Sequence, residues 1–352
     1  MKKLSIIVPM YNVAPYIERC VKSLEHQDIP IDNFEIICIN DGSPDNSSEI
    51  VKSLQAQYSN IHLIDQENQG VSRARNNGIE CATGKYILFI DPDDYVDTNS
   101  FARILRVAED KNAQVFFLGY TFLDEDGNIK CQRFNELAQD KIYSGIEAYF
   151  VSRGDGRTDP DRMVAILFET NFLNTHCLRF LPDMPYLEDG ELISRILCLA
   201  ERCFFYGGSF YQRTTRPGSA TNSRLFYSLS AINGFVNAAV NLQEFRNQTS
   251  LSLTQKEFLN QPIVKFVILS VTAATRSMRL NPFLSVISTL KKNSLEVLEL
   301  DGCVLFYKKL GRLYNLTPYL LYLYLVVKAG IRFIKSFKPR RLKSKIDRAG
   351  IL

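Results

Sequence analysis

The stretch Leu88-Phe89-Ile90-Asp91-Pro92-Asp93-Asp94 runs from an apolar segment directly into three carboxylates. An apolar strand is normally buried, whereas carboxylates are rarely buried without a partner. The sequence therefore predicts a buried strand whose acids emerge at its end. The three acids repel one another, and a divalent cation with oxygen ligands would relieve that repulsion. The alternative at this point is an ordinary acidic turn, because Pro and Asp are common turn residues.

Strands and helices alternate on both sides of this stretch. Apolar runs that end in polar turns predict five strands, at residues 4–8, 34–40, 61–64, 85–90 and 115–121. Between them, apolar residues at helical spacing predict helices that begin near Pro15, after Asp45, at Gly70 and at Phe101. Such alternation predicts an α/β fold with a mostly parallel, doubly wound central sheet and flanking helices.

Four polar loops follow the predicted strands, at residues 9–12, 41–45, 65–70 and 91–94. Right-handed crossovers bring the carboxyl ends of parallel strands to one edge of the sheet, where open α/β sheets bind ligands. The convergence of four polar loops on that edge favours a ligand site over a simple turn.

Several familiar ligand motifs do not fit the chain. The dinucleotide fingerprint G-x-G-x-x-G does not occur, and the stretch from Gly78 to Lys85 fails as a phosphate loop in its spacing and at Tyr86. A calcium-binding EF-hand loop starting at Asp91 fails at Val96 and Ala102. The eight cysteines form no C-x-x-C pair, and the three histidines are far apart, so zinc sites find no support. Unpaired cysteines in apolar segments favour a reducing cytoplasm.

A second acidic cluster, Leu187-Glu188-Asp189-Gly190-Glu191, precedes a predicted helix. Acids at a helix start can serve only to complement the helix dipole, and that interpretation stays open here. Residues 203–213 read as a strand, and helical patterns dominate from about residue 225. We expect two units, an α/β domain over residues 1–222 and a helical C-terminal region over residues 223–352.

The sequence of the C-terminal region predicts that it contacts a membrane surface. Residues 316–327 are almost entirely apolar and interleave Tyr with Leu, but spanning a bilayer takes about 20 residues. Nine Lys or Arg and one Asp follow between Lys328 and Arg348, a local excess of +8 in a chain of net charge +4. Clustered cations attract anionic lipids, so residues 313–348 are a predicted in-plane anchor. The alternative is a buried helix with a basic end. An acidic body with a basic tail gives no indication of nucleic-acid binding.

In their order and spacing, six short segments within roughly the first 220 residues resemble glycosyltransferase family 2, of the GT-A fold and the bacterial surface-polysaccharide type. The segments are residues 5–12, 40–43, 68–76, 91–94, 187–189 and 216–219. The resemblance implies transfer of a sugar, with inversion, from a nucleotide-sugar donor such as a UDP-sugar. The acceptor would be a hydroxyl of a saccharide or lipid-linked glycan. The protein would lie in the cytoplasm, on the inner face of the cytoplasmic membrane.

The resemblance also assigns roles to residues. Pro9 and Tyr11 would cradle the base, Asp41 would accept a hydrogen bond from it, and Asn68 and Arg75 would help hold the nucleotide. Asp91 would lie near the ribose and form with Asp93 a D-x-D motif, in which Asp93 ligates Mn²⁺ or Mg²⁺ on the diphosphate. Asp189 would be the general base, with Glu188 as the second candidate. Arg216 and Ser219 would close on the diphosphate, a role for which Arg213 competes.

Two other functions compete with sugar transfer as interpretations of the sequence. A sugar-nucleotide pyrophosphorylase has a similar fold and metal but a glycine- and arginine-rich loop after the first strand, where this chain has Met10-Tyr11-Asn12-Val13. The remaining alternative is a catalytically inactive, nucleotide-sugar-binding module docked on a membrane. The intact acids disfavour it. Neither the donor sugar nor the acceptor can be read from the sequence.

Overall fold

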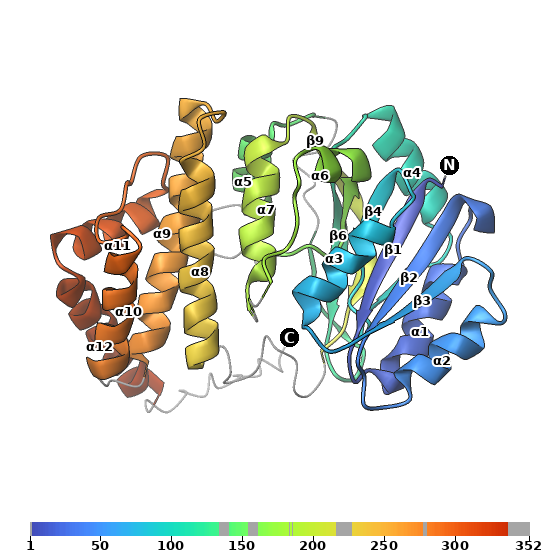
Figure 1. The fold of residues 1–352 in the computed structure, drawn as a ribbon, viewed down its shortest axis with the longest axis horizontal. Helices are drawn as coiled ribbons and strands as arrows, with labels where there is room; N and C mark the ends of the chain where they lie inside the picture. Colours follow the sequence, from blue (N-terminus) through green and yellow to red (C-terminus); the bar gives the residue numbers. More distant parts are fainter. Residues whose placement is uncertain are drawn as a thin grey trace, which may run out of the picture.

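A computed structural model gives the structure of the chain. It describes residues 2–133, 141–153, 161–182, 184, 186–215, 227–276 and 280–336, with side chains up to residue 329. An α/β body holds the N-terminal half, and a group of helices formed by the C-terminal part packs beside it (Figure 1). The predicted boundary at residues 222 and 223 lies outside the described residues.

Four parallel strands form the first half of the sheet, in the order β3 (Ile61–Gln66), β2 (Phe34–Asp41), β1 (Leu4–Met10) and β4 (Tyr86–Phe89). Every residue of β1, β2 and β4 is buried, which explains their nearly continuous apolar sequences. The predicted parallel arrangement of these strands is confirmed.

The two faces of this half-sheet are covered by different helices. Leu4, Ile6 and Val8 share a core with α1 (Ala14–Glu25), α2 (Ser47–Gln55) and α4 (Phe101–Asp110). Ile7, which points to the other face, packs with Ile79 of α3 (Val71–Cys81). Both faces are therefore apolar, and polar chemistry is left to the strand ends.

The second half of the sheet differs from the prediction of a mostly parallel sheet. β8 (Ile166–Glu169) lies between β4 and β6 (Val115–Leu123) and is antiparallel to both. β6 then pairs in parallel with β9 (Cys203–Arg213), while the short strands β5 (Tyr95–Val96) and β7 (Ile129–Arg133) pair antiparallel at the margins. The sheet is mixed, because β8, a strand that the sequence analysis did not predict, inserts into it.

The helices that follow β7 in the chain cover the α3 face of the sheet. α5 (Gly145–Ser152), α6 (Thr170–Thr175) and α7 (Glu188–Leu199) lie between the sheet and the C-terminal helices (Figure 1). The C-terminal helices are α8 (Leu229–Arg246), α9 (Leu253–Thr275), α10 (Leu280–Lys292), α11 (Leu305–Leu316) and α12 (Pro318–Ser336). One apolar core runs from Phe89 of β4 through α7 to α8 and α9. The C-terminal helices are thus packed onto the sheet body through α7.

α9 is the one described helix that is long and apolar enough to cross a membrane. Its apolar window is 83% buried inside the fold, and Phe258, Val264 and Val267 belong to the core. The helix therefore serves as the central helix of the C-terminal group.

Candidate active site

The loops that follow the four parallel strands meet at the carboxyl edge of the sheet, as predicted. The backbone N–H of Asn12 donates to Ser43 Oγ at 3.3 Å, and that of Ala14 donates to Asp45 Oδ2 at 2.8 Å. The loop after β3 is joined to the end of β2 through Asp41. These bonds hold the loops together around the start of α3 and the acids that follow β4.

Arg75 of α3 lies at the centre of a partly buried charge cluster with three carboxylates. Its Nη2 contacts Asp91 Oδ1 at 3.1 Å, and its Nη1 contacts Glu188 Oε1 at 2.8 Å and Asp189 Oδ1 at 2.9 Å. The arginine is 4% exposed. One cation therefore links the acidic loop after β4 to the acids that begin α7, although the two segments are about a hundred residues apart in sequence.

The charge balance of this Arg75 cluster leaves excess negative charge. Burial raises the pKa of Asp189 to about 7; Arg75 lowers it, and the charges of Glu188 and Asp91 raise it. The backbone N–H of Met163 also donates a hydrogen bond to Asp189. A carboxyl group with a pKa near neutrality can exchange protons at physiological pH, which is the property a general base needs. The predicted base and its second candidate, Glu188, thus share one partner.

Asp94 has a different environment from Asp91 and Asp93. It is 2% exposed, and it accepts hydrogen bonds from the Tyr211 hydroxyl at 2.6 Å and the Thr214 backbone N–H at 2.7 Å. Burial, together with Asp91 and Asp93, raises its pKa to about 8. The same Tyr211 oxygen accepts from the backbone N–H of Asp91 at 3.1 Å. Asp94 therefore ties the acidic loop to the end of β9.

The residues predicted to bind the nucleobase lie at the ends of β1, β2 and β3. Pro9 is buried within β1, whereas the Tyr11 ring directly after that strand is 51% exposed. Asp41 is 4% exposed, and its carboxylate accepts from Gln66 Nε2 and from the backbone N–H groups of Gln69 and Gly70. Asn68 is exposed beside it. Tyr11 and Asn68 thus present surface to solvent at this edge, while Asp41 organises the loop after β3.

The predicted contact between Arg75 and the nucleotide stays a prediction. In the structure, both terminal nitrogens of the Arg75 guanidinium group contact carboxylates. Arg216 and Ser219 lie outside the described residues. Arg213, the competitor for the diphosphate role, lies at the end of β9 with its guanidinium 5.5 Å from the centroid of the Phe122 ring. The acidic loop is bounded on its other side by Arg19, whose Nη2 donates to the Asp93 backbone oxygen at 2.8 Å.

The acidic loop does not by itself form a closed metal cage. Among the described residues, no group of three or more His, Cys, Asp or Glu is arranged to hold a metal ion. Mg²⁺ in nucleotide sites is commonly held by one or two carboxylates together with substrate phosphates. The donor set of Asp91 and Asp93 fits a cation that arrives with a diphosphate.

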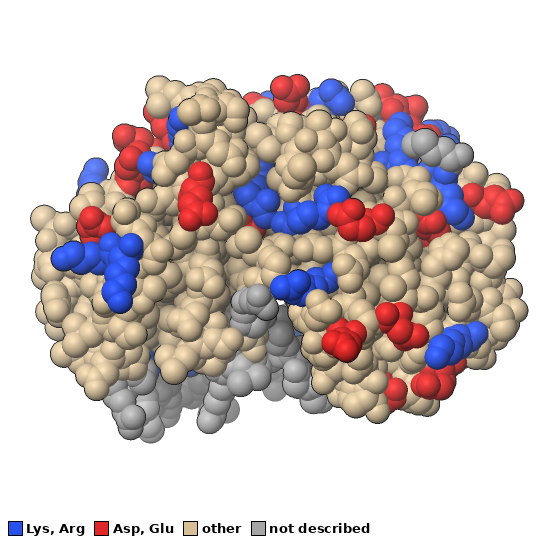
Figure 2. Space-filling model, in the orientation of Figure 1, with Lys and Arg blue, Asp and Glu red and all other residues tan. Residues whose placement is uncertain are grey.

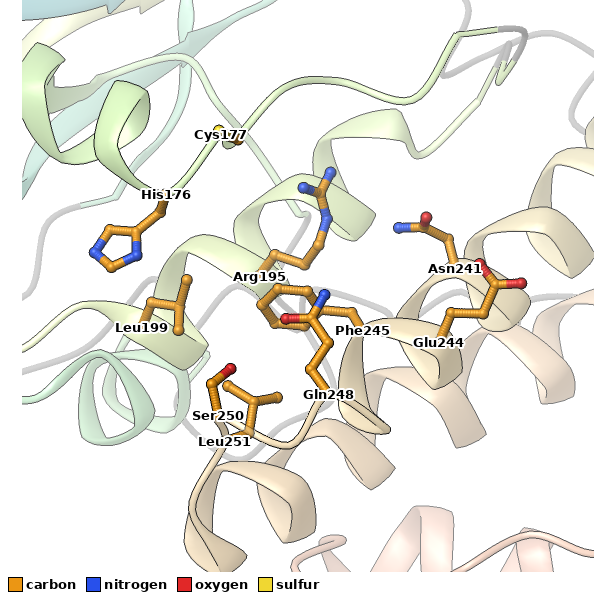
Figure 3. Close-up of a pocket in the computed structure, with 10 residues that line it drawn as sticks. All are labelled: His176, Cys177, Arg195, Leu199, Asn241, Glu244, Phe245, Gln248, Ser250 and Leu251. Atoms are coloured by element: carbon orange, nitrogen blue, oxygen red, sulfur yellow. The ribbon is translucent and has the colours of Figure 1, made fainter.

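A separate pocket lies at the far end of α7. It has a volume of about 400 Å³ and is lined by Arg195 and Leu199 of α7, by α8 and by residues 176, 177, 250 and 251. In Figure 3 the Arg195 and Asn241 side chains approach each other at its floor. Arg195 donates to Glu191 at 2.6 Å and to the Arg179 carbonyl at 2.6 Å. This arginine is committed to structural contacts, so the pocket does not extend the acidic site.

Sequence reasoning missed a buried cluster behind Asp189. Asp161 lies between Arg153 and Lys265, with its side chain only 2% exposed. A detectable signal was present, since Lys265 is a lone charge in the apolar run Ile263-Val264-Lys265-Phe266-Val267. A charge buried in such a run requires a partner. The sequence could not identify that partner, because Asp161 is about a hundred residues away.

Comparison with known proteins relates part of the chain to a described family. Residues 5–157 match the family described as glycosyl transferase family 2. The uncharacterized glycosyltransferase EpsJ of Bacillus subtilis is 45% identical over 117 residues, which cover 33% of each chain. The poly(ribitol-phosphate) beta-glucosyltransferase of Bacillus spizizenii is 34% identical over 115 residues, 32% of this chain and 18% of that protein. The matched region thus spans a third or less of these relatives.

A solved structure shares the fold over nearly the whole chain. TarS residues 1–349 of S. aureus, in complex with UDP-GlcNAc, superposes with a TM-score of 0.69 at 17% identity, covering 94% of this chain and 92% of that one. The likeness confirms the predicted GT-A fold followed by a helical C-terminal region.

Proposed function

Residues 5–157 match glycosyl transferase family 2, and from this premise we propose that the chain is an inverting, metal-dependent hexosyltransferase. It moves a sugar from a nucleotide-sugar, a UDP-sugar by preference, to a hydroxyl of a saccharide or lipid-linked glycan during surface-polysaccharide synthesis. The observation that carries the proposal is the Arg75 cluster, in which the acids after β4 meet those that begin α7. The described complex of TarS with UDP-GlcNAc supports a UDP-sugar donor.

In the proposed reaction, Asp189 takes the proton of the acceptor hydroxyl while its oxygen bonds to the anomeric carbon. The bond from that carbon to the nucleotide diphosphate breaks from the opposite side, so the configuration inverts. The pKa of Asp189, near 7, suits this proton transfer at neutral pH. Arg75 holds Asp189 and Glu188 at 2.9 and 2.8 Å and so fixes the orientation of the base.

The donor is proposed to lie across the carboxyl ends of β1, β2 and β4. In this proposal the Tyr11 ring, which is exposed, stacks on the nucleobase, and Pro9, Asp41 and Asn68 line the same site. Asp91 would lie near the ribose, and Asp93 would meet the diphosphate with a bound Mn²⁺ or Mg²⁺. When bound, such a cation neutralises negative charge on the departing diphosphate. Arg216 and Ser219 remain proposed diphosphate contacts.

Donor turnover tests the proposed function directly. Purified protein is incubated with a panel of UDP- and GDP-sugars and Mn²⁺ or Mg²⁺, and release of the nucleoside diphosphate is followed with and without saccharide acceptors. We expect release with at least one donor, its loss on chelation of the metal, and its loss in Asp93→Asn. Donor binding without release in any combination would overturn transfer and leave the inactive binding module.

Attachment to the membrane surface is proposed to occur through α12. Five neighbouring side chains on one face of this helix are 41–58% exposed: Tyr319, Leu320, Leu323, Tyr324 and Val327. The opposite face packs inward, with Leu321 fully buried and the Tyr322 ring 4.8 Å from that of Phe283. An apolar face backed by a packed one suits a helix that lies in the plane of the interface.

Charge supports the choice of an anionic membrane as the partner. The nine Lys and Arg between residues 328 and 348 follow this face directly in sequence. Elsewhere, on the part of the surface that Figure 2 describes, Lys and Arg gather near the middle of the view, and acidic side chains lie on either side. A basic tail that follows an apolar helical face in sequence favours the cytoplasmic face of the membrane, where anionic lipids attract cations.

Vesicle sedimentation tests this attachment. The wild type is expected to sediment with vesicles that contain anionic phosphatidylglycerol, and less so at high salt. Leu320→Glu combined with Leu323→Glu should weaken sedimentation about tenfold or more, since each change places a charge in the interface. Leu253→Glu is the matched control, because Leu253 is 73% exposed at the start of α9. Equal sedimentation of both variants would remove α12 as the docking face.

A further inference from the structure

The buried ion cluster behind Asp189 joins three parts of the chain, and we name it the Asp161 cluster: Asp161, Arg153 and Lys265. Arg153, which follows α5, places its Nη2 2.7 Å from Asp161 Oδ1. Lys265 of α9 contacts the other carboxylate oxygen. The side chains of the two cations are 8% and 14% exposed. The cluster thus connects the C-terminal helices to the segment that enters β8.

Arg153 is itself fixed by α5. Its guanidinium carbon lies 3.6 Å from the centroid of the Tyr149 ring, and its Nη1 donates to the Tyr149 carbonyl at 3.1 Å. An arginine held by a ring and a carbonyl has little freedom to follow a moving carboxylate. Asp161 is therefore held from the α5 side by a rigid donor and from the α9 side by Lys265.

The segment that carries Asp161 touches the first turn of α7 at two places. A Cβ on Gly190 would lie 2.4 Å from Asp161 Oδ2, so the helix backbone at residue 190 is packed directly against this carboxylate. Two residues further on, the Met163 backbone N–H donates to Asp189. The neighbours Glu188 and Asp189 begin α7, which means that residues 161–163 set where these acids lie.

The residues that follow are also fixed. Arg162 Nη1 donates to the carbonyls of Val164 and Ala165 at 2.7 and 2.9 Å, and Val164 bridges to Phe89 at the end of β4. The segment is therefore anchored at one end to the strand that leads to Asp91 and at the other to α9. Its position links both sides of the Arg75 cluster.

We propose that Asp161 and Lys265 are positioning residues for the general base. Lys265 holds Asp161 from α9, and the segment 161–163 then fixes the first turn of α7 and donates the Met163 N–H to the Asp189 carboxylate. The inference rests on the proposed function of Asp189. A misplacement of about 1 Å at a reacting group can cost about a hundredfold in rate, so an anchor remote from the substrate can affect turnover.

A purely structural role makes a different prediction. If the Asp161 cluster only stabilises the fold, removal of Lys265 lowers the melting temperature and leaves the turnover of the folded protein unchanged. If it positions the base, kcat falls more than the KM for the donor changes, because Asp161 packs against Gly190 in the turn that carries Asp189, whereas the proposed donor contacts lie after β1, β2 and β4. The two roles are therefore separated by kinetics measured below the melting temperature.

The closing experiment compares four variants of the full chain with the wild type. Lys265→Met keeps the pair of Asp161 with Arg153, so the carboxylate retains a partner. Lys265→Gln, which keeps a hydrogen-bond donor, is the second variant in case Lys265→Met does not fold. Lys265→Arg tests rescue by a conserved charge. Lys256→Met is the matched control, since Lys256 lies on the same helix and outside the cluster.

We expect Lys265→Met to lower kcat for sugar transfer about tenfold or more, with the donor KM within about twofold of the wild type. The kcat of Lys265→Gln should lie between those of Lys265→Met and the wild type. Lys265→Arg should recover at least part of the lost kcat, and Lys256→Met should have the kcat of the wild type. Wild-type kcat in both Lys265→Met and Lys265→Gln would overturn the positioning role and leave the proposed function intact. A wild type that turns over no donor would overturn the proposed function and this inference with it.

Discussion

The two charge clusters on either side of the first turn of α7 are opposite in balance. The Arg75 cluster holds one cation among three carboxylates, whereas the Asp161 cluster holds one carboxylate between two cations. The pKa values follow the difference. Burial and the neighbouring acids raise that of Asp189 to about 7. Although burial opposes it, Lys265 and Arg153 lower that of Asp161 to about 2.

The contrast separates an electrostatically strained cluster from a satisfied one. A carboxyl whose pKa is raised on folding destabilises the fold at neutral pH, and one whose pKa is lowered stabilises it. Active sites commonly sacrifice stability for reactive groups, while structural ion pairs do not. The first cluster is therefore the one expected to act on a ligand, and the second the one expected to hold it in place.

The largest expected effect is on catalysis in the Arg75 cluster. Asp189→Asn should lower kcat about a thousandfold, because the neutral amide cannot take the proton of the acceptor. It should leave the melting temperature unchanged or raised, since it removes a buried acid. Steady-state transfer assays measure kcat, and thermal unfolding measures the melting temperature. Glu188→Gln is the control, with less than a tenfold loss; the reverse order of the two variants would make Glu188 the base.

The second effect is on stability in the Asp161 cluster. Asp161→Asn should lower the free energy of unfolding by about 3 kcal/mol, because it leaves Arg153 and Lys265 buried without a countercharge. Denaturant titration of this variant beside Asp126→Asn, a change at an exposed acid in the turn before β7, gives the measurement. A loss no larger than in the control would show that the two clusters do not differ as described.

The two clusters should differ in how acid changes their contribution to the free energy of unfolding. The pKa of Asp161 is about 2 when folded and near 3.8 when unfolded. Its contribution is therefore complete above about pH 4 and is lost as the pH falls towards 2, an effect of about 2 kcal/mol. Urea unfolding of the wild type and of Asp161→Asn from pH 6 to pH 2 should converge at the acid end. Parallel curves would contradict the lowered pKa.

The smallest effect is on the rate in mildly acidic solution. Because the protonated form of Asp189 cannot accept a proton, kcat should fall about tenfold for each pH unit below about 7. The slope should flatten in Asp189→Asn, measured over the same range with a buffer series of constant ionic strength. An unchanged acid limb in that variant would assign the limb to another group.

The sequence predicted those parts of the fold that depend on local pattern. The four parallel strands and the helix that begins near Gly70 were predicted because apolar runs and polar turns lie next to one another in the chain. The strand at 203–213 was also readable from the sequence. The convergence of the loops followed from the topology alone.

The sequence could not predict the contacts made between distant segments. β8 lies in a stretch with no clear periodicity, and its pairing with β4 and β6 depends on tertiary packing. The resemblance to glycosyltransferase family 2 implied that Asp91 and Asp189 lie in one site, but it did not indicate that Arg75 bridges them. The Asp161 cluster required knowing which residue meets Lys265. The structure also gave Asp94, to which the sequence assigned no role, a part in fixing the loop through Tyr211.

The insertion of β8 between β4 and β6 has a consequence for the order in which the chain can fold. β1 to β4 pair with one another and can assemble as soon as the first hundred residues have left the ribosome. The end of β6 can pair at once with β7, but its first part, Val115-Phe116-Phe117, must wait for β8 and β9, which are synthesised later. Until then a strongly apolar strand has unpaired edges, the situation in which nascent chains aggregate. Synthesis of this protein should therefore be most dependent on chaperones in the interval between β6 and β9.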